Sequence, residues 1–571
     1  MHSSNSIIDV KLGAVNGWGM KTEYDLVVLG SGAGGLAAAV TAAHHGARVL
    51  VLERAEVLGG TTAWSGGWIW APGNPLAPEG SADGVRAYLQ AVTGNHFNPA
   101  RVDAFLTAAP QMVAFFQQNT ALQFDLGAAI PDTYSDLPGA GMGARSVIAR
   151  PYDARALGSS LSLLRRPLAE TTFHGMTIQA GADLRAFLTM QRNPRALAYV
   201  AGRVLRHARD MAFHGRGMDL RNGAALAGRL LRTALDLGVT FSTGAEVVAL
   251  ERAGRVTALR LANGAHITTR RGVILATGGF GHDHARMQPL VPDADAHLSL
   301  SVPTAQGAGA RLATAIGADL DTGMASAAAL CPVSSVPWGN GKSGVFPHII
   351  DRGKPGLIGV LRNGRRFCNE GLGYHDYVTA LHAACAQGPV ESWLVCDHRF
   401  LRRYGLGIVR PAPVPWRGWQ KRGYLYTAPT IEQLARACGI DDAGLVRTVA
   451  DWNQHASHGV DPAFGRGTTP YMRLQGDPDH APNPCIAPIL APPFHAVRVT
   501  AGSFGTFAGL AVDARARVLD GARQPIDGLY AVGADAASPF GGFYPAGGIN
   551  LGPALTFGYL AGRDAATGAI T

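Results

Sequence analysis

The chain has 571 residues, of which 47% are hydrophobic, so it is long enough to fill the cores of two domains or of one composite domain. Its net charge of +9 at pH 7 is largely local and no nucleic-acid motif is present, so we expect no nucleic-acid partner. The six cysteines form no CxxC pair and no metal-ligand spacing with histidine, which predicts reduced thiols, no metal site and a cytoplasmic location.

Residues 24–53 have the order strand, glycine turn, helix and second strand, which is typical of a nucleotide-binding βαβ unit. In the turn, Gly30 allows a tight bend, Gly32 lets the backbone approach a pyrophosphate and Gly35 lets helix and strand pack closely. Glu53 ends the next strand, 53 − 35 = 18 residues later, where its carboxylate can accept hydrogen bonds from an adenosine ribose. The expected nucleotide contacts here are Gly30, Ser31, Gly32, Gly34, Gly35, Glu53 and Arg54.

A second glycine-rich loop follows within residues 54–73. Its small and hydroxyl residues let the backbone approach a flat ligand, which a plain NAD domain does not require. The loop resembles the second glycine-rich loop of flavoproteins in the succinate dehydrogenase and fumarate reductase superfamily, and this resemblance implies FAD. The loop contains no histidine, so we expect the FAD to be bound non-covalently. The expected contacts are Gly60, Thr61, Thr62, Ser65, Gly66 and Gly67.

Apolar residues recur at helical spacing between residues 81 and 118, which predicts helices with core-facing stripes. Residues 131–139 then form a polar, turn-rich loop around Tyr134. A single loop tyrosine is usually half-buried surface, so only the resemblance described below gives Tyr134 a function.

Residues 141–216 form an arginine-rich insertion. The favoured interpretation is a solvated helical face or a subunit contact, and the alternative is an amphipathic segment that lies on an anionic bilayer, which would suit a lipid-soluble substrate. Residues 1–20 lack the features of a signal peptide, and no stretch reaches the roughly 18 uninterrupted apolar residues of a membrane span. We therefore expect a soluble protein that is at most attached to a membrane surface.

The predicted fold is α/β, with a discontinuous Rossmann-like FAD-binding domain and an inserted α+β domain for the substrate. The first part of the FAD domain is expected at residues 24–284, because a strand near residue 275 leads to Ala-Thr-Gly-Gly, a sequence that returns the chain to the cofactor in such flavoproteins. Residues 285–495 are richer in Pro and Trp and are expected to form the inserted domain, after which residues 496–571 resume the FAD domain.

Further cofactor contacts are expected where these segments return to the cavity. A strand ending at Asp535 places an acid suited to a ribityl hydroxyl, and residues 547–555 open a last helix whose positive N-terminus would face the flavin pyrimidine. The complete additional set is Val247, Thr277, Gly278, Gly533, Asp535, Asn550 and Leu551.

The chain from residue 24 to 566 resembles the FAD-dependent 3-ketosteroid dehydrogenase family. The motifs that carry the resemblance are the two glycine loops, residues 365–370 (Arg-Arg-Phe-Cys-Asn-Glu) and residues 541–548 (Gly-Gly-Phe-Tyr-Pro-Ala-Gly-Gly). Where fumarate reductases place a histidine and an arginine that clamp a dicarboxylate, and a second arginine that donates the proton, this chain has Tyr544, Gly548 and Tyr374. Such a site cannot cheaply desolvate two carboxylates, but it can bind a neutral ketone.

The resemblance implies a role for each of these residues. The Tyr544 hydroxyl and the Gly548 N–H would bind the C3 carbonyl of a 3-ketosteroid and stabilise the enolate. Tyr374 would remove the C2 proton while hydride leaves C1 for flavin N5, and Tyr134 matches the family's helper tyrosine. Because the unperturbed pKa of tyrosine is about 10, the base needs such help near neutral pH. Tyr377 or His375 remains an alternative to Tyr374.

The expected substrate is therefore an apolar, polycyclic ketone, with a quinone or another acceptor taking the electrons. One departure concerns the exact ketone: Phe507 and Ala508 stand where the steroid dehydrogenases tend to have Lys-Gly or Gly-Gly. The alternatives are Δ4-(5α) desaturation of a 3-ketosteroid, reduction of an unsaturated acid such as fumarate or urocanate, and a non-enzymatic FAD-binding protein. For the acid reductase the nearest cations are Arg365 and Arg366.

Overall fold

A computed structural model describes residues 22–568, so the prediction about a signal peptide at residues 1–20 lies outside the described residues. The larger sheet has the strand order β21-β22-β11-β1-β2-β8, with β10 and β9 extending it beside β11. Strands β1, β2, β8, β11 and β22 run parallel. Their bounds are β1 Glu23–Leu29, β2 Val49–Leu52, β8 Thr240–Ser242, β9 Val247–Ala253, β10 Arg255–Leu261, β11 His266–Leu275, β21 Arg517–Leu519 and β22 Pro525–Ala531.

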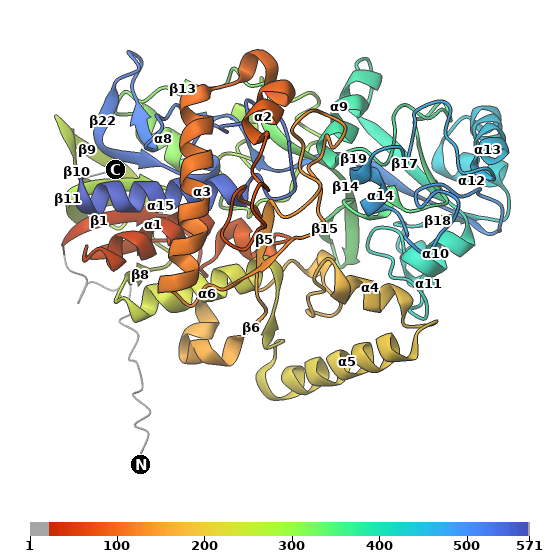
Figure 1. Ribbon diagram of the computed structural model, residues 1–571, viewed down its shortest axis with the longest axis horizontal. Helices are drawn as coiled ribbons and strands as arrows, with labels where there is room; N and C mark the ends of the chain where they lie inside the picture. Colours follow the sequence, from red (N-terminus) through yellow and green to blue (C-terminus); the bar gives the residue numbers. More distant parts are fainter. Residues whose placement is uncertain (1–21, 569–571) are drawn as a thin grey trace.

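Helices cover this sheet because its central strands are apolar on both faces, as parallel strands are when both faces are packed. Helix α1 (Ala33–His44) lies along α15 (Leu551–Thr567), and α3 (Pro99–Asn119) crosses outside them (Figure 1). α2 (Val85–Thr93) and α3 confirm the helices predicted between residues 81 and 118, and α6 (Asn222–Asp236) packs on α1. Strands from residues 23–275 and 517–531, with helix α15, thus build one cofactor domain, as the discontinuous fold predicted.

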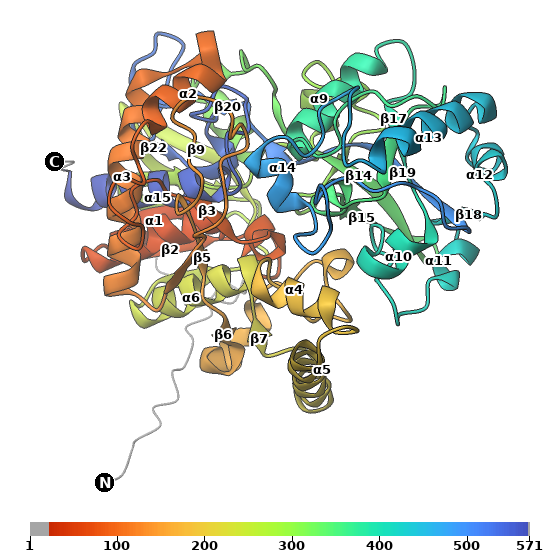
Figure 2. The same cartoon turned by 45° about the vertical axis from the view of Figure 1, so that its right-hand side comes forward.

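The second lobe is built around a mixed sheet in the order β15-β14-β19-β17-β16 (Figure 2). Its central strand, β19, spans Phe494–Thr506, so the sheet continues eleven residues past the domain boundary expected at residue 495 (506 − 495). The other strands are β14 Ala328–Gly339, β15 Lys342–Pro347, β16 Leu357–Val360, β17 Glu391–Cys396, β12 Leu298–Ser299 and β18 Tyr426–Ala428. Its helices include α9 Tyr374–Ala384, α10 His398–Tyr404, α12 Ile431–Cys438, α13 Asp442–Ala456 and α14 Pro470–Gln475.

The arginine-rich insertion includes α4 (Ala182–Thr189) and α5 (Pro194–His214), and α5 lies outside α4 at the edge of the molecule (Figures 1 and 2). A buried ion pair between Arg203 and Asp183, at 2.6 Å, fastens α5 to α4. α5 exposes the large apolar side chains Leu197, Val204, Leu205, Met211 and Phe213, whereas the Tyr199 hydroxyl donates to Asp183 Oδ1 on α4 at 2.8 Å. Among residues 22–568, no helix is long and apolar enough to cross a bilayer.

Candidate active site

The first glycine turn brings the ends of β1 and β11 into direct contact with α1. Gly30 has φ +104°, and a Cβ there would lie 2.2 Å from the carbonyl oxygen of Ala276. A Cβ on Gly35 would lie 2.1 Å from the carbonyl oxygen of Gly30. No side chain fits at either position, so the two glycines allow the close helix–strand packing that the spacing predicted.

The Ser31 hydroxyl connects the two glycine loops. It donates to Glu53 Oε2 at 2.6 Å and accepts from the Gly59 N–H at 3.0 Å. The Ser31 N–H also donates to Glu53 Oε2, at 3.1 Å. Thr62 Oγ1 accepts the Ala33 N–H at 2.8 Å, which ties the second loop to the start of α1. Glu53 therefore holds the first glycine turn in shape.

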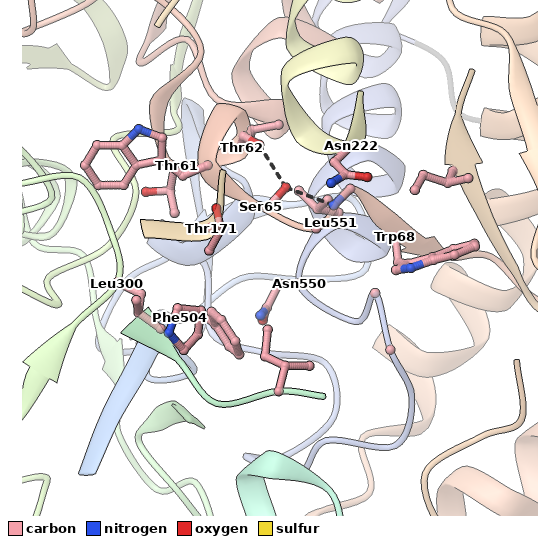
Figure 3. A pocket seen from close by; sticks show the side chains of 18 of the residues that line it. Thr61, Thr62, Ser65, Trp68, Thr171, Asn222, Leu300, Phe504, Asn550 and Leu551 are labelled. Carbon is pink, nitrogen blue, oxygen red and sulfur yellow. Dashed lines mark hydrogen bonds between the residues drawn. The ribbon is translucent and has the colours of Figure 1, made fainter. Parts of the chain in front are cut away.

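Both glycine loops open into one cavity of about 1510 Å³ that also reaches the second lobe. Figure 3 shows the hydroxyls of Thr61, Thr62 and Ser65 on its wall, with Asn550, Phe504 and Leu300 further along. Of the expected cofactor residues, all except Gly35 and Asp535 line this cavity. Arg54 among them also donates to Gln306 Oε1 at 2.9 Å.

Asp535 takes a different position from the one expected. Its buried carboxylate accepts from the Thr277 N–H at 2.5 Å, from the Thr277 hydroxyl at 2.9 Å and from the Gly279 N–H at 2.9 Å. The carboxylate therefore fixes the turn after β11, and it is Thr277 that lines the cavity in its place. The sequence could not reveal this, because the acid lies 258 residues from Thr277.

The residues of the cavity fit an FAD molecule. At the start of α1, the N–H groups of Gly32 and Gly34 have no hydrogen-bond partner among residues 22–568, so they are free at the positive end of the helix, where a pyrophosphate can bind. At the start of α15, the N–H groups of Asn550 and Leu551 are likewise without a partner in the described part of the chain. That second helix end suits the pyrimidine of a flavin, whose reduced ring is anionic.

Tyr374 and Tyr544 meet in this cavity. Their ring centroids are 4.8 Å apart, and the Tyr544 hydroxyl accepts from Asn550 Nδ2 at 3.2 Å. Phe504 packs edge-on against Tyr374 at 5.4 Å, and Phe507 lies 6.0 Å from Tyr544. Desolvation in this aromatic enclosure raises the pKa of both phenols well above the ordinary value, so both carry their protons near neutral pH.

Gly548 completes the group. Its φ is +105°, and a Cβ would lie 2.6 Å from the Trp70 backbone nitrogen, so only glycine fits. Its carbonyl accepts from Trp70 and Gly552, whereas its N–H finds no partner within residues 22–568. Tyr544 and this N–H therefore offer two donors to the same cavity.

Tyr134 does not line the cavity. Its hydroxyl donates to Asp376 Oδ1 at 2.7 Å, and Asp376 Oδ2 is buried without a hydrogen-bond partner in the described part of the chain. Desolvation raises the pKa of the Asp376 carboxyl to about 6. The sequence analysis missed Asp376, although its position in the first turn of α9, two residues after Tyr374, is the signal that could have found it.

Tyr471 on α14 is a third phenol of the cavity that sequence reasoning missed. It is buried, it lies close enough to influence the pKa values of Tyr374 and Tyr544, and its own pKa is raised by burial to about 12. Its N–H donates to Ser135 Oγ at 3.0 Å, so the loop that carries Tyr134 docks against α14. Neither of the alternatives to Tyr374 lines the cavity: Tyr377 bonds to Ser392, and His375 Nδ1 accepts from the Leu330 N–H.

The arginines that an acid reductase would use are placed elsewhere. Arg366 is bound to Glu370 Oε2 at 2.7 Å and to Asp461 Oδ1 at 2.8 Å, and neither it nor Arg365 lines the cavity. The reacting end of the pocket is therefore built from phenols and backbone.

A cavity formed by two glycine loops and two helix N-termini, and joined to a compartment lined by phenols, defines an FAD-dependent oxidoreductase. The chain belongs to the family described as FAD binding domain, which matches residues 25–551. It is 39% identical to 4-oxocyclohex-2-ene-1-carboxylate 5-dehydrogenase of Sinomonas cyclohexanicum, over 95% of this chain and 93% of that protein. It is 33% identical to 3-oxosteroid 1-dehydrogenase of Mycobacterium tuberculosis, over 94% of this chain and 97% of that protein.

Among solved structures, 3-ketosteroid Δ1-dehydrogenase from Sterolibacterium denitrificans in complex with 1,4-androstadiene-3,17-dione is similar, with a TM-score of 0.89 and 33% identity. The match covers 96% of this chain and 100% of the other. The resemblance to the 3-ketosteroid dehydrogenases is thus confirmed over nearly the whole chain, as are FAD as cofactor and an oxidoreductase that acts on CH–CH groups.

Proposed function

We propose that this protein introduces a C=C bond next to the carbonyl of a cyclic ketone. The observation that carries the proposal is the convergence of Tyr374, Tyr544 and the Gly548 N–H in the cavity that the FAD loops form. A dehydrogenation of this kind removes a proton from the carbon beside the carbonyl and a hydride from the next carbon. The bound FAD supplies the hydride acceptor at N5.

Tyr544 and Gly548 bind the ketone oxygen. The Tyr544 hydroxyl is buried, and hydrogen bonds to a developing enolate are worth more in such surroundings than in water. By stabilising the enolate they acidify the adjacent C–H, and the Asn550 amide orients the Tyr544 hydroxyl.

Tyr374 receives the proton. Since desolvation raises the pKa of Tyr374, the residue needs a route by which its own proton can leave. Tyr471 lies beside Tyr374, and the Tyr134–Asp376 pair lies beyond it, with a carboxylate that can take a proton at near-neutral pH. Tyr134 therefore acts as a helper of the base from outside the cavity.

Two substrate classes have support. The relatives named as 3-oxosteroid 1-dehydrogenases, and the apolar cavity wall of Leu300, Phe346 and Phe504, favour Δ1 desaturation of a 3-ketosteroid. The relative that acts on 4-oxocyclohex-2-ene-1-carboxylate favours a single-ring keto acid. A quinone or another acceptor would reoxidise the flavin in either case, and the apolar face of α5 supports a peripheral contact with an anionic bilayer.

The test is to incubate the purified yellow protein with androst-4-ene-3,17-dione or 4-oxocyclohexanecarboxylate and an artificial electron acceptor. We expect the conjugated enone from at least one of them, and no reduction of fumarate by the enzyme with reduced viologen. If several cyclic ketones give neither product nor flavin bleaching, the proposed function is wrong.

A further inference from the structure

The end of the cavity away from the FAD loops contains a buried lysine. Lys354 directly follows the short 3₁₀ turn Asp351–Gly353, lines the cavity and is only 9% exposed. Its ammonium donates to the Gly476 carbonyl oxygen at 2.7 Å. No carboxylate lies within 4.0 Å of it in the described chain, residues 22–568. Buried charges in proteins are usually paired, so this ammonium lacks a counter-ion.

The nearest acid is already neutralised. Asp477 forms an ion pair with Arg403, and it also accepts the Tyr404 hydroxyl at 2.6 Å. Lys354 is therefore a surplus positive charge. Desolvation lowers the pKa of Lys354, and the opposing effect of the Asp477 carboxylate, which lies beyond 4.0 Å, does not restore it.

A second cation of the cavity, Arg410, likewise forms no ion pair with a carboxylate among residues 22–568. Arg410 lines the cavity and donates to the carbonyl oxygens of Glu170 and Thr172, at 2.8 and 2.7 Å. Lys354 and Arg410 are thus two cavity cations whose hydrogen bonds go to backbone carbonyl oxygens, whereas the reacting end is built from phenols and backbone.

Helix α14 sets the separation between the two ends. Tyr471 near its start lies beside the phenols, and Gly476, which accepts from Lys354, follows its last residue. Five residues at ~1.5 Å rise place the lysine contact roughly 7.5 Å along the helix from Tyr471. This rise along the backbone of α14 is similar to the length of one six-membered ring that carries a ketone and an anionic group at opposite ends.

We propose that Lys354 binds a carboxylate carried by the substrate on the side of its ring opposite to the ketone. This inference rests on the proposed function and narrows it: the substrate is a single-ring keto acid, and its acid group supplies the missing counter-ion. A buried ion pair formed only with the acid also gives selectivity, because a neutral ketone leaves the ammonium unpaired.

The experiment compares 4-oxocyclohexanecarboxylate with its methyl ester in the FAD-loaded wild-type protein and in Lys354→Gln and Lys354→Met. Glutamine retains a donor for the Gly476 carbonyl and removes the charge, and flavin content reports on folding. Lys421→Met, a change at an exposed lysine away from the cavity, is the matched control. We expect the wild type and Lys421→Met to prefer the acid, and the acid-to-ester ratio of kcat/KM to fall by about 10²-fold in both Lys354 variants.

A binding measurement keeps the two proposals separable. 4-Hydroxybenzoate carries its phenolic oxygen and its carboxylate at opposite ends of one ring, and flavin absorbance can report its Kd beside that of phenol. We expect the carboxylate to tighten binding at least tenfold in the wild type and not in Lys354→Gln. If 4-hydroxybenzoate binding depends on Lys354 while no ketone reacts, the proposed function fails and this inference stands. If ketones react but neither ratio changes in the Lys354 variants, this inference is wrong.

Discussion

Tyr544→Phe isolates one of the two donors to the ketone oxygen. The variant keeps the ring, which packs 4.8 Å from Tyr374 and 6.0 Å from Phe507, so the aromatic enclosure should survive. It removes the hydroxyl and leaves the Gly548 N–H in place. Loss of one donor of this kind costs roughly 10²–10³ in rate, or about 2.7–4 kcal/mol of transition-state stabilisation. We expect a fall of that size in kcat with an unchanged yellow protein.

The structure also predicts a smaller loss of rate when Asn550, which donates to the Tyr544 hydroxyl, is replaced. Asn550 Nδ2 donates to Tyr544 at 3.2 Å, so Asn550→Ala leaves the donor present but less well oriented, and we expect a fall of about tenfold, below that of Tyr544→Phe. Steady-state rates with a saturating ketone and an artificial acceptor, normalised to flavin content, measure both. If Tyr544→Phe retains the wild-type kcat on a ketone that the parent oxidises, Tyr544 is not an oxyanion donor and the reasoning is refuted.

Three further predictions concern the surroundings of the site. Gly548→Ala should lower FAD content and thermal stability together, because the new Cβ would lie 2.6 Å from the Trp70 nitrogen, whereas Gly547→Ala, with open space around its Cβ, should change neither. Asp376→Asn should raise the free energy of unfolding at pH 8 but not at pH 4. The pKa of Asp376 in the folded protein, about 6, exceeds the ordinary 3.8, so its ionisation destabilises the fold as the pH rises from about 4 to 6. Equal gains in the free energy of unfolding at both pH values would contradict this prediction. Leu205→Glu combined with Phe213→Glu should weaken cosedimentation with anionic vesicles; unchanged sedimentation with loss of a dimer would assign the α5 face to a subunit contact.

The glycine loops could be predicted from the sequence because their chemistry is local. A tight turn, a close pyrophosphate and close helix–strand packing each need glycine at a fixed spacing, and Gly30 and Gly35 are found with no room for a side chain. The same holds for Gly548, whose position at the start of α15 follows from the Gly-Gly sequence before a helical pattern.

Contacts between distant segments could not be predicted in this way. Tyr134 and Asp376 are 242 residues apart, so their hydrogen bond depends on how the two lobes meet. Asp535 was expected at the cavity, but the turn after β11 needed its carboxylate for two N–H groups. Lys354 and Tyr471 belong to segments without a recognisable motif, and only the packing of α14 against the turn Asp351–Gly353 brings them to the cavity.

The most direct test of the central claim is a single turnover without oxygen, in which the FAD-loaded protein is mixed with a ketone that it oxidises. In the wild type we predict that the flavin bleaches as one equivalent of enone forms. Tyr374→Phe should bind the same ketone, as seen in the flavin absorbance, yet stay yellow and form no enone, because it lacks the group that receives the proton. Bleaching of Tyr374→Phe at the wild-type rate would contradict the account.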